Sequence, residues 1–469
     1  MNRIKFGTDG WRAVIARDFT VENVARVSMA CSTWLQRKYR EATVVIGYDC
    51  RFGGPMFAEA AAKILGSKGI RVILSDRFTS TPVVSFVVNM MKAELGIMLT
   101  ASHNPPDYNG FKLKGTHGGP LFDEDVRDIE NMIDYENQLD LDLIKMETLI
   151  DKDILTVGNI EEYYVQHVSE NFDLPELRKY APSVAFDPMY GSGQNILGAI
   201  LPGIKVLHQK QDFSFGNTPP EPLERNLGEF LEFVRNDPDI KIGIAVDGDA
   251  DRIALVDENG NYIDSHHIIL LLIHYLAGYL GETGSIITGF SSTVKVEKLA
   301  EHYGLQVKRV KIGFKEISRH MVKEDVLVGG EESGGISVKG HIAERDGIWM
   351  GLIILRFMHE SGKSLSELIN EIYSITGSFA FARSDLHITR ELKNRVLDKC
   401  QKGIFDSFGD NRVEHIESLD GYKYFFDKNS WFMIRPSGTE PILRTYAEAP
   451  TMDQAKELLA SGYRTIMSS

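Results

Sequence analysis

Short apolar runs alternate with amphipathic stretches over most of the chain, a pattern that predicts strands of a parallel sheet covered by helices. In a first segment, strands are predicted at residues 43–50, 69–76 and 93–100, with helices at 55–68 and from Pro82. The same rhythm returns twice, with strands predicted at 183–188, 204–208, 240–246, 285–290, 305–310 and 325–328, and helices from Gly193 and Val294. Three related α/β segments are therefore expected.

Polar, glycine-bearing loops follow the last predicted strand of each segment. These loops are TASHNPPDYNGFK (100–112), DGDADR (247–252) and GGEESGG (329–335). In open α/β sheets, ligands bind beyond the carboxyl ends of the strands. The three loops are therefore expected to face one shared cleft.

The last hundred residues have a different pattern, with a helix predicted at 391–402, an extended stretch at 431–449 and a final helix from Met452. We expect three tandem related α/β domains with mixed, mostly parallel sheets, followed by a smaller C-terminal α+β domain. The expected boundaries are 1–155, 156–257, 258–374 and 375–469.

Composition narrows the class of protein. The 469 residues are 43% hydrophobic and 25% charged, as in globular proteins, and the net charge of −14 disfavours nucleic-acid binding. The longest apolar run, from Ile268, is interrupted by His274 and is too short to span a bilayer. The N-terminus has no apolar signal core, and the three cysteines lack metal-ligand spacing. A cytoplasmic protein with no membrane span is expected.

The stretch 123–153 is rich in acidic residues. Because charge runs usually face water, we expect a solvated helix and a connection there.

The DGDADR loop predicts a site for a divalent cation. Asp247, Asp249 and Asp251 alternate, so an irregular loop can direct three carboxylates to one hard cation, for which Mg²⁺ is the intracellular candidate. The alternative is a calcium loop of EF-hand type, which requires glycine where this chain has Arg252. Its flanking stretches also read as strands rather than helices. We therefore favour a catalytic Mg²⁺ site.

Two further loops are candidates for ligand binding. RPSGTE (435–440) offers Arg435, two hydroxyls and a glycine turn, which suits an anion, although a simple β-turn explains the same residues. GGEESGG offers Glu331, Glu332 and Ser333, which suit sugar hydroxyls. A carboxylate pair also fits glycoside hydrolysis, whose required separation cannot be assigned to neighbouring residues.

Ser102 is the candidate nucleophile of the first loop. In an extended chain His103 would point away from it, so a Ser-His relay does not follow from adjacency, and the GxSxG elbow is missing. A serine beside a divalent cation can carry a phosphoryl group while a nearby lysine, here Lys112, moves protons. The alternative is an ordinary turn or helix-capping serine.

Taken together, FGTDGWR, TASHNPPDYNGFK, DGDADR, GGEESGG and RPSGTEP resemble, in content and order, the motifs of the α-D-phosphohexomutase superfamily. The resemblance extends from Phe6 to Glu448. It implies three related α/β domains and a fourth of different fold.

The resemblance also implies roles for individual residues. Ser102 would be the phosphoserine and a metal ligand together with the three aspartates, and Arg12, Lys112 and Arg252 would flank the reacting phosphoryl group. The sugar would be held by Glu331 and Ser333, with Lys311 in the loop 308–316 and Arg345 as weaker candidates. The distal phosphate would be bound by Arg435, Ser437, Gly438 and Thr439.

The implied activity is interconversion of hexose 1-phosphate and hexose 6-phosphate through a phosphoserine and a bisphosphorylated sugar, which also serves as activator. Glu332 and Gly335 stand where the phosphoglucosamine branch usually has Gln and His, which favours glucose or mannose phosphates. A phosphoglucosamine mutase, a metal-dependent sugar-phosphate phosphatase and a noncatalytic sugar-phosphate-binding protein are the alternatives. The expected partner is a small sugar phosphate, and the chain is expected to be a monomer or homodimer.

Overall fold

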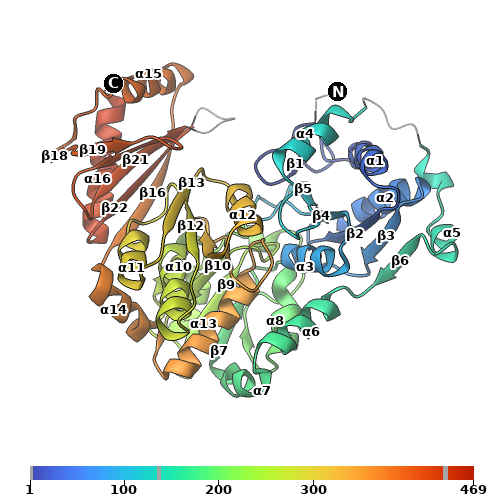
Figure 1. The fold of residues 1–469 in the computed structure, drawn as a ribbon, viewed down its shortest axis with the longest axis horizontal. Helices are drawn as coiled ribbons and strands as arrows, with labels where there is room; N and C mark the ends of the chain where they lie inside the picture. Colours follow the sequence, from blue (N-terminus) through green and yellow to red (C-terminus); the bar gives the residue numbers. More distant parts are fainter. Residues whose placement is uncertain (1–3, 135–138, 437–441, 469) are drawn as a thin grey trace. The chain divides into compact units, whose positions relative to one another are not determined.

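The computed structural model describes residues 4–134, 139–436 and 442–468. The chain forms two compact units, one of residues 1–285 and 313–368, the other of residues 286–312 and 369–469 (Figure 1).

The first unit begins with a six-stranded mixed sheet. Its order is β1 (Trp11–Val14), β5 (Tyr108–Lys114), β4 (Leu95–Leu99), β2 (Thr43–Tyr48), β3 (Arg71–Ser75) and β6 (Leu155–Gly158). Strands β4, β2, β3 and β6 pair in parallel, whereas β5 runs antiparallel to both β4 and β1. Strand β4 (LGIML) is buried throughout, as expected of a strand covered on both faces.

Helices cover both faces of this sheet. Figure 1 shows α1 (Val21–Lys38) and α2 (Gly54–Ser67) on one face and α3 (Thr81–Met91) on the other. Helix α3 begins where the Ser80 side chain accepts a hydrogen bond from the Val83 amide, with Pro82 in its first turn. The acidic connection contains α4 (Asp123–Asn131) and α5 (Met146–Asp151), while residues 135–138 lie outside the described part.

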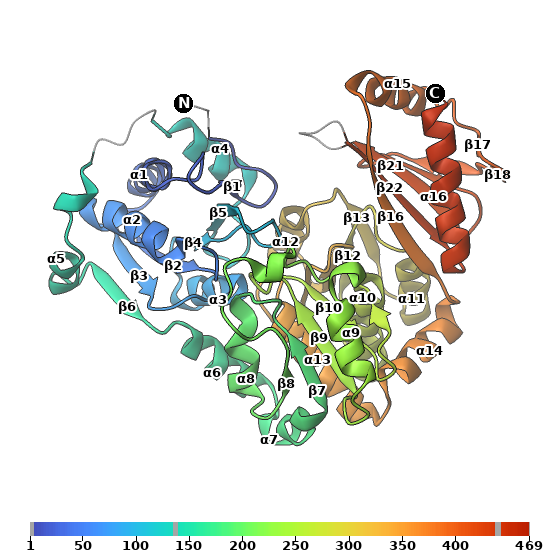
Figure 2. The ribbon, with the colours of Figure 1, turned by 180° about the vertical axis from the view of Figure 1, so that it is seen from behind.

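A second mixed sheet follows in the same unit. Its order is β11 (Tyr262–Ile263), β10 (Ile253–Val256), β9 (Ile242–Val246), β7 (Val184–Asp187) and β8 (Lys205–Val206). Helix α9 (Gly228–Arg235) packs on one face through Phe230 and Val234 (Figure 2). On the other face, Gly351 of α13 (Gly347–Ser361) lies so close to Ile244 that a Cβ atom there would be 3.1 Å from its side chain.

The remaining elements of this unit are helical, apart from one strand pair. The helices are α6 (Glu161–Asn171), α7 (Leu174–Leu177), α8 (Ile196–Ile200), α10 (Ser265–Ile273) and α12 (Phe314–Lys323). Strand β14 (Val326–Gly330) pairs antiparallel with β15 (Ile336–Val338). The turn between these two strands is the GGEESGG loop.

The second unit combines a short α/β segment with the C-terminal domain. Strand β12 (Ser285–Gly289) pairs in parallel with β13 (Val307–Val310), and α11 (Lys295–Tyr303) connects them. The C-terminal sheet is antiparallel, in the order β16 (Ala380–His387), β22 (Ile442–Ala449), β21 (Trp431–Pro436), β20 (Tyr422–Phe425) and β19 (His415–Glu417). The other elements are α14 (Leu365–Thr376), α15 (Arg390–Gln401), α16 (Met452–Met467) and the β17 (Ser407–Phe408) and β18 (Asn411–Arg412) pair.

The predicted fold class is confirmed: α/β segments with mixed sheets precede an antiparallel C-terminal domain. One element differs, because the end of the predicted loop 100–112 lies on strand β5, which places Lys112 on a strand. The four domain boundaries stay a prediction. Among the described residues, no helix has the length and apolar character needed to cross a membrane.

Candidate active site

Ser102 lies in the serine loop (residues 100–107), which connects β4 to β5. Its Oγ atom donates a hydrogen bond of 2.7 Å to Asp247 Oδ2. Its backbone has a φ of +52°, an uncommon conformation for a side-chain-bearing residue. Because the chain is not extended here, the geometry of an extended chain does not apply, and His103 Nδ1 lies 3.2 Å from Ser102 Oγ. Burial holds the pKa of His103 well below its ordinary value.

The metal loop (residues 247–252) connects β9 to β10 and brings three buried carboxylates together. Ligand atoms of Asp247, Asp249 and Asp251 lie within 4.8 Å of one another, and within the described part of the chain no other such cluster is found. Gly248 permits the loop to approach the serine loop, because a Cβ atom there would be 2.6 Å from the Ser102 carbonyl oxygen. A side chain at this position would push the two loops apart.

The oxygen atoms of these carboxylates fit a cation. One oxygen of Asp247 accepts the Asp251 and Arg252 amides at 3.0 Å, and the other accepts Ser102. The Oδ1 atoms of Asp249 and Asp251 are buried and have no hydrogen-bond partner among the described residues. Buried carboxylate oxygens without a partner are costly, and a divalent cation satisfies them. The donor set therefore fits Mg²⁺, which prefers oxygen ligands.

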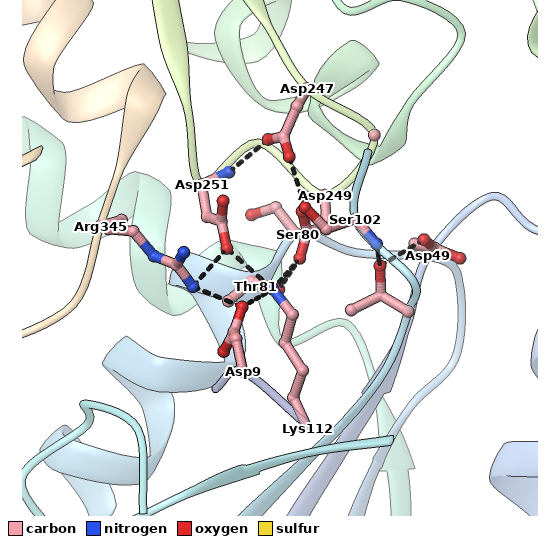
Figure 3. Close-up of polar contacts among 12 residues, drawn as sticks. Asp9, Asp49, Ser80, Thr81, Ser102, Lys112, Asp247, Asp249, Asp251 and Arg345 are labelled. Carbon is pink, nitrogen blue, oxygen red and sulfur yellow. Dashed lines mark hydrogen bonds and ion pairs between the residues drawn. The ribbon is translucent and has the colours of Figure 1, made fainter. Parts of the chain in front are cut away.

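Cationic side chains contact the Oδ2 atoms of Asp249 and Asp251 (Figure 3). Lys112 Nζ lies 2.7 Å from Asp249 Oδ2, 2.8 Å from Asp251 Oδ2 and 3.0 Å from Asp9 Oδ2. Burial alone would lower the pKa of Lys112, but the three carboxylates outweigh it and raise this pKa above its ordinary value. Thr81 also donates to Asp249 Oδ2.

Arg345 completes this network. Its Nη2 atom lies 2.7 Å from Asp9 Oδ2 and 2.8 Å from Asp251 Oδ2. The cations Arg345 and Lys112 overcome the effect of burial and hold the pKa of Asp9 well below its ordinary value. The sequence suggested Arg345 as a sugar contact. In the structure it contacts the carboxylates of Asp9 and Asp251. Asp9, Asp251 and Arg345 come from three different sequence segments.

Arg12 and Arg252 lie at the edge of this cluster. Arg12 Nη1 donates to Asn104 Oδ1 at 2.7 Å, while the side chain stays about one fifth exposed. Arg252 Nη1 donates to Glu221 at 3.1 Å, and the backbone of Arg252 bridges that of Gly335. Arg12 therefore contacts the serine loop, and Arg252 ends the metal loop, while their contact with a phosphoryl group stays a prediction.

The GGEESGG loop lies next to the metal loop through that backbone bridge. Glu331 is buried, and its Oε1 accepts a 2.7 Å hydrogen bond from the Gly313 amide. Burial raises the pKa of Glu331 to about 7. Ser333 lies partly exposed in the same turn. Glu331, Ser333 and Ser102 therefore belong to one compact unit.

Lys311 and Arg435 belong to the second unit. Lys311 is exposed and follows β13, and the amide of the next residue, Ile312, donates to Asp420 Oδ2 at 2.9 Å. The same Asp420 oxygen accepts Arg435 Nε at 3.1 Å. One carboxylate is thus hydrogen-bonded to both Arg435 and the residue that follows Lys311. Ser437, Gly438 and Thr439 lie outside the described residues.

Four residues at the site were not identified from the sequence: Asp9, Asp49, Arg51 and Thr81. Asp9 lies inside the FGTDGWR motif. Asp49 lies near the end of the predicted strand 43–50 and Arg51 follows it, so position at a strand end was an available signal. Thr81 gave no such signal, because it reads as a residue at a helix start.

Comparisons with known proteins agree with this geometry. The chain matches the family described as Phosphoglucomutase/phosphomannomutase: alpha/beta/alpha domain I over residues 3–140, domain II over 162–260, domain III over 264–375 and the C-terminal domain over 393–462. It is 30% identical to a phosphoglucomutase/phosphomannomutase of Thermococcus kodakarensis, with 98% of each chain covered. It is 29% identical to a phosphoglucosamine mutase of Methanocaldococcus jannaschii, again with 98% coverage of each.

A solved structure from Thermus thermophilus, provisionally described as a phosphomannomutase, is 30% identical and superimposes with a TM-score of 0.87 over 99% of each chain. The match covers the whole four-domain architecture, and the serine, aspartate and lysine side chains of its motifs converge in this structure. The chain therefore belongs to the α-D-phosphohexomutase superfamily and is a phosphohexomutase.

Proposed function

We propose that this phosphohexomutase interconverts the 1-phosphates and 6-phosphates of glucose, mannose or both through a phosphorylated Ser102. The observation that carries the proposal is the convergence of a hydroxyl, an ammonium group and three carboxylates. Ser102 Oγ lies 2.7 Å from Asp247, while Lys112 Nζ lies 2.7 Å from Asp249. A nucleophilic oxygen, a proton-carrying group and a candidate cation site are thus within contact distance.

In the proposed reaction the free hydroxyl oxygen of a hexose phosphate attacks the phosphorus atom carried by Ser102. The bond between phosphorus and Ser102 Oγ breaks, and the hydroxyl proton ends on that Oγ, with Lys112 as the candidate group that moves it. The bisphosphorylated sugar then turns around, and Ser102 takes the other phosphoryl group by the reverse step. Arg12 and Arg252 would bind the charged oxygens during transfer.

Mg²⁺ would be held by Asp247, Asp249, Asp251 and an oxygen on Ser102, and when bound it stabilises negative charge on the phosphoryl oxygens. The unpartnered oxygens of Asp249 and Asp251 support this assignment. Glu331 and Ser333 would accept sugar hydroxyls, with Lys311 as a further contact. Arg435, Ser437, Gly438 and Thr439 would bind the distal phosphate, a grip that a phosphatase has no need for.

The hexose preference is supported by the space around Gly335. A Cβ atom there would lie 2.3 Å from Arg345 Cδ, so the histidine expected of the phosphoglucosamine branch cannot enter while Arg345 contacts Asp9. The similarity to phosphoglucosamine mutases makes glucosamine phosphate the second candidate. An unmodified hexose phosphate remains our first choice.

The experiment measures Mg²⁺-dependent conversion of glucose 1-phosphate, mannose 1-phosphate and glucosamine 1-phosphate, with and without a trace of glucose 1,6-bisphosphate. The expected result is conversion of the first two to 6-phosphates, stimulated by the bisphosphate and abolished in Ser102→Ala. The exposed Ser169→Ala is the matched control. Release of free phosphate instead would favour the phosphatase, and preference for glucosamine 1-phosphate would overturn the proposed hexose.

A further inference from the structure

We propose that Arg51 is a positioning residue that holds the serine loop in the shape required for phosphoryl transfer. This inference rests on the proposed role of Ser102. Arg51 follows β2, outside every motif that identified the family, and its side chain is fully buried. It is the structural centre around which the serine loop folds.

The guanidinium group of Arg51 satisfies four backbone carbonyl groups at once. Its Nη atoms donate hydrogen bonds to the carbonyl oxygens of Ser102 (2.6 Å), Asn104 (2.6 Å), Pro105 (2.7 Å) and Tyr108 (3.0 Å). The Pro105 carbonyl also accepts the Tyr108 amide at 3.1 Å, and Arg51 supplies donors to all four of these carbonyls. The planar donor arrangement of arginine matches this task, whereas the compact ammonium of lysine does not.

Asp49 orients Arg51 and also reaches the amide of Ser102. Asp49 Oδ2 lies 3.3 Å from Arg51 Nε, and Asp49 Oδ1 accepts the Arg51 amide at 2.9 Å. Asp49 also accepts the hydroxyl of Thr100, whose Oγ1 accepts the Ser102 amide at 2.8 Å. The Ser102 carbonyl thus accepts a hydrogen bond from Arg51. The Ser102 amide donates to Thr100 Oγ1, and the Thr100 hydroxyl in turn donates to Asp49.

This double attachment matters because Ser102 has a φ of +52°. Such a conformation costs roughly 1 to 3 kcal/mol for a residue with a side chain, so surrounding contacts must impose it. The same conformation directs Ser102 Oγ to Asp247 and places His103 beside it. Loss of the Arg51 contacts would let the loop relax and would move the nucleophilic oxygen.

Arg51 is not placed to bind the transferred group itself. Its two Nη atoms already donate to four carbonyls, and its Nε faces Asp49. The Phe215 ring, from the loop that follows β8, covers the guanidinium at 4.9 Å. Arg12, which is partly exposed and donates to Asn104, is the better phosphoryl contact. Arg51 therefore acts through the loop.

The test compares wild type with Arg51→Lys, which keeps the charge but loses the planar donor set. The control is Arg178→Lys, because Arg178 Nε also donates to a backbone carbonyl, that of Ile200, at 3.0 Å. Purified proteins are mixed with glucose 1,6-bisphosphate, and the rate of Ser102 phosphorylation is followed by intact mass. Mn²⁺ affinity and thermal unfolding are measured on the same samples.

The expected result for Arg51→Lys is folded protein that binds Mn²⁺ within about twofold of wild type, since Arg51 has no hydrogen bond or ion pair with the three metal-loop aspartates. Its rate of Ser102 phosphorylation should fall by about 100-fold, the cost of misplacing a reacting group by an ångström. Arg178→Lys should keep the wild-type rate. Phosphorylation of Arg51→Lys at the wild-type rate would overturn the inference, as would a parallel loss of Mn²⁺ affinity.

Asp49→Asn decides the matter if Arg51→Lys does not fold. A folded Asp49→Asn with slow phosphorylation and intact Mn²⁺ binding supports the positioning role. Wild-type phosphorylation in this variant, or failure of both variants to fold, overturns it. Absence of phosphorylation on wild-type Ser102 is a separate result, which rejects the proposed function rather than the role of Arg51 alone.

Discussion

Ser102 Oγ donates a 2.7 Å hydrogen bond to Asp247 Oδ2, although the two residues lie in loops that connect strands of different sheets. The contact joins a loop of residues 100–107 to a loop of residues 247–252, and Gly248 permits the close approach. Neither loop by itself brings a hydroxyl group to the carboxylate cluster. Their contact creates the arrangement on which the proposed phosphoryl transfer depends.

Asp249→Asn should weaken divalent metal binding by at least the ~10- to 100-fold that changes around a metal site commonly cause. The substitution removes one negative charge from the cluster and replaces an oxygen ligand whose Oδ1 has no hydrogen-bond partner among the described residues. Mn²⁺ titration followed by electron paramagnetic resonance measures the affinity. Asp398→Asn, in the exposed last turn of α15, is the control. Unchanged Mn²⁺ affinity would place the cation elsewhere.

Gly335→Ala should disrupt the Arg345 network. The new Cβ would lie 2.3 Å from Arg345 Cδ, so the side chain must leave its contacts with Asp9 and Asp251. Overpacking of this kind costs about 1 to 3 kcal/mol, and activity should fall together with thermal stability. Gly228→Ala, where nothing lies within 4 Å of the added Cβ at the start of α9, should be neutral or stabilising. Wild-type stability and turnover in Gly335→Ala would show that Arg345 moves without consequence.

Asp420→Asn should weaken substrate binding without changing the fold. Asp420 accepts both the Ile312 amide and Arg435 Nε, so it orients the predicted phosphate-binding arginine. Loss of about 1 kcal/mol from this charged hydrogen bond corresponds to roughly a fivefold rise in KM, with kcat little changed. Steady-state kinetics with glucose 1-phosphate measure both constants. A fall in kcat at constant KM would contradict a binding role.

Glu161→Gln should stabilise the protein increasingly as pH rises from about 4.5 to about 7, and by a constant amount above that. Glu161 begins α6, its Oε1 is buried without a hydrogen-bond partner among the described residues, and burial raises its pKa from 4.5 to about 7. Between these two pH values the folded chain retains a proton that the unfolded chain has released. The contribution of Glu161 to the free energy of unfolding therefore falls as pH rises, by about 3 kcal/mol at most.

The measurement for Glu161 is the difference in unfolding temperature between the variant and wild type. This difference should be near zero at pH 4 and positive at pH 8. Glu162→Gln, at the exposed neighbouring position, serves as the control. An equal difference at both pH values would mean that the carboxylate is not the cause.

Much of the fold followed from local patterns. Strand β4 reads as a continuous apolar run because it is buried on both faces, and α3 begins at a Ser-Thr-Pro sequence that caps a helix. Strand β5 was missed, because the Asn-Gly pair in YNGFKLK is a common turn signal, although the alternation that follows it is typical of a strand. Its antiparallel pairing with β4 and β1 is what buries Lys112 beside Asp249.

The sequence by itself determined the alternation of strands and helices, the position of polar loops after strands and the identity of Ser102, Lys112 and the three aspartates as candidates. These features depend on local periodicity and on residue chemistry, both of which can be read from a short stretch of sequence. The tertiary structure decided that Arg345 binds Asp9 and Asp251, that His103 faces Ser102, and that Arg51 fills the serine loop. Such contacts join residues far apart in the chain or depend on an unusual backbone angle, so no local pattern contains them.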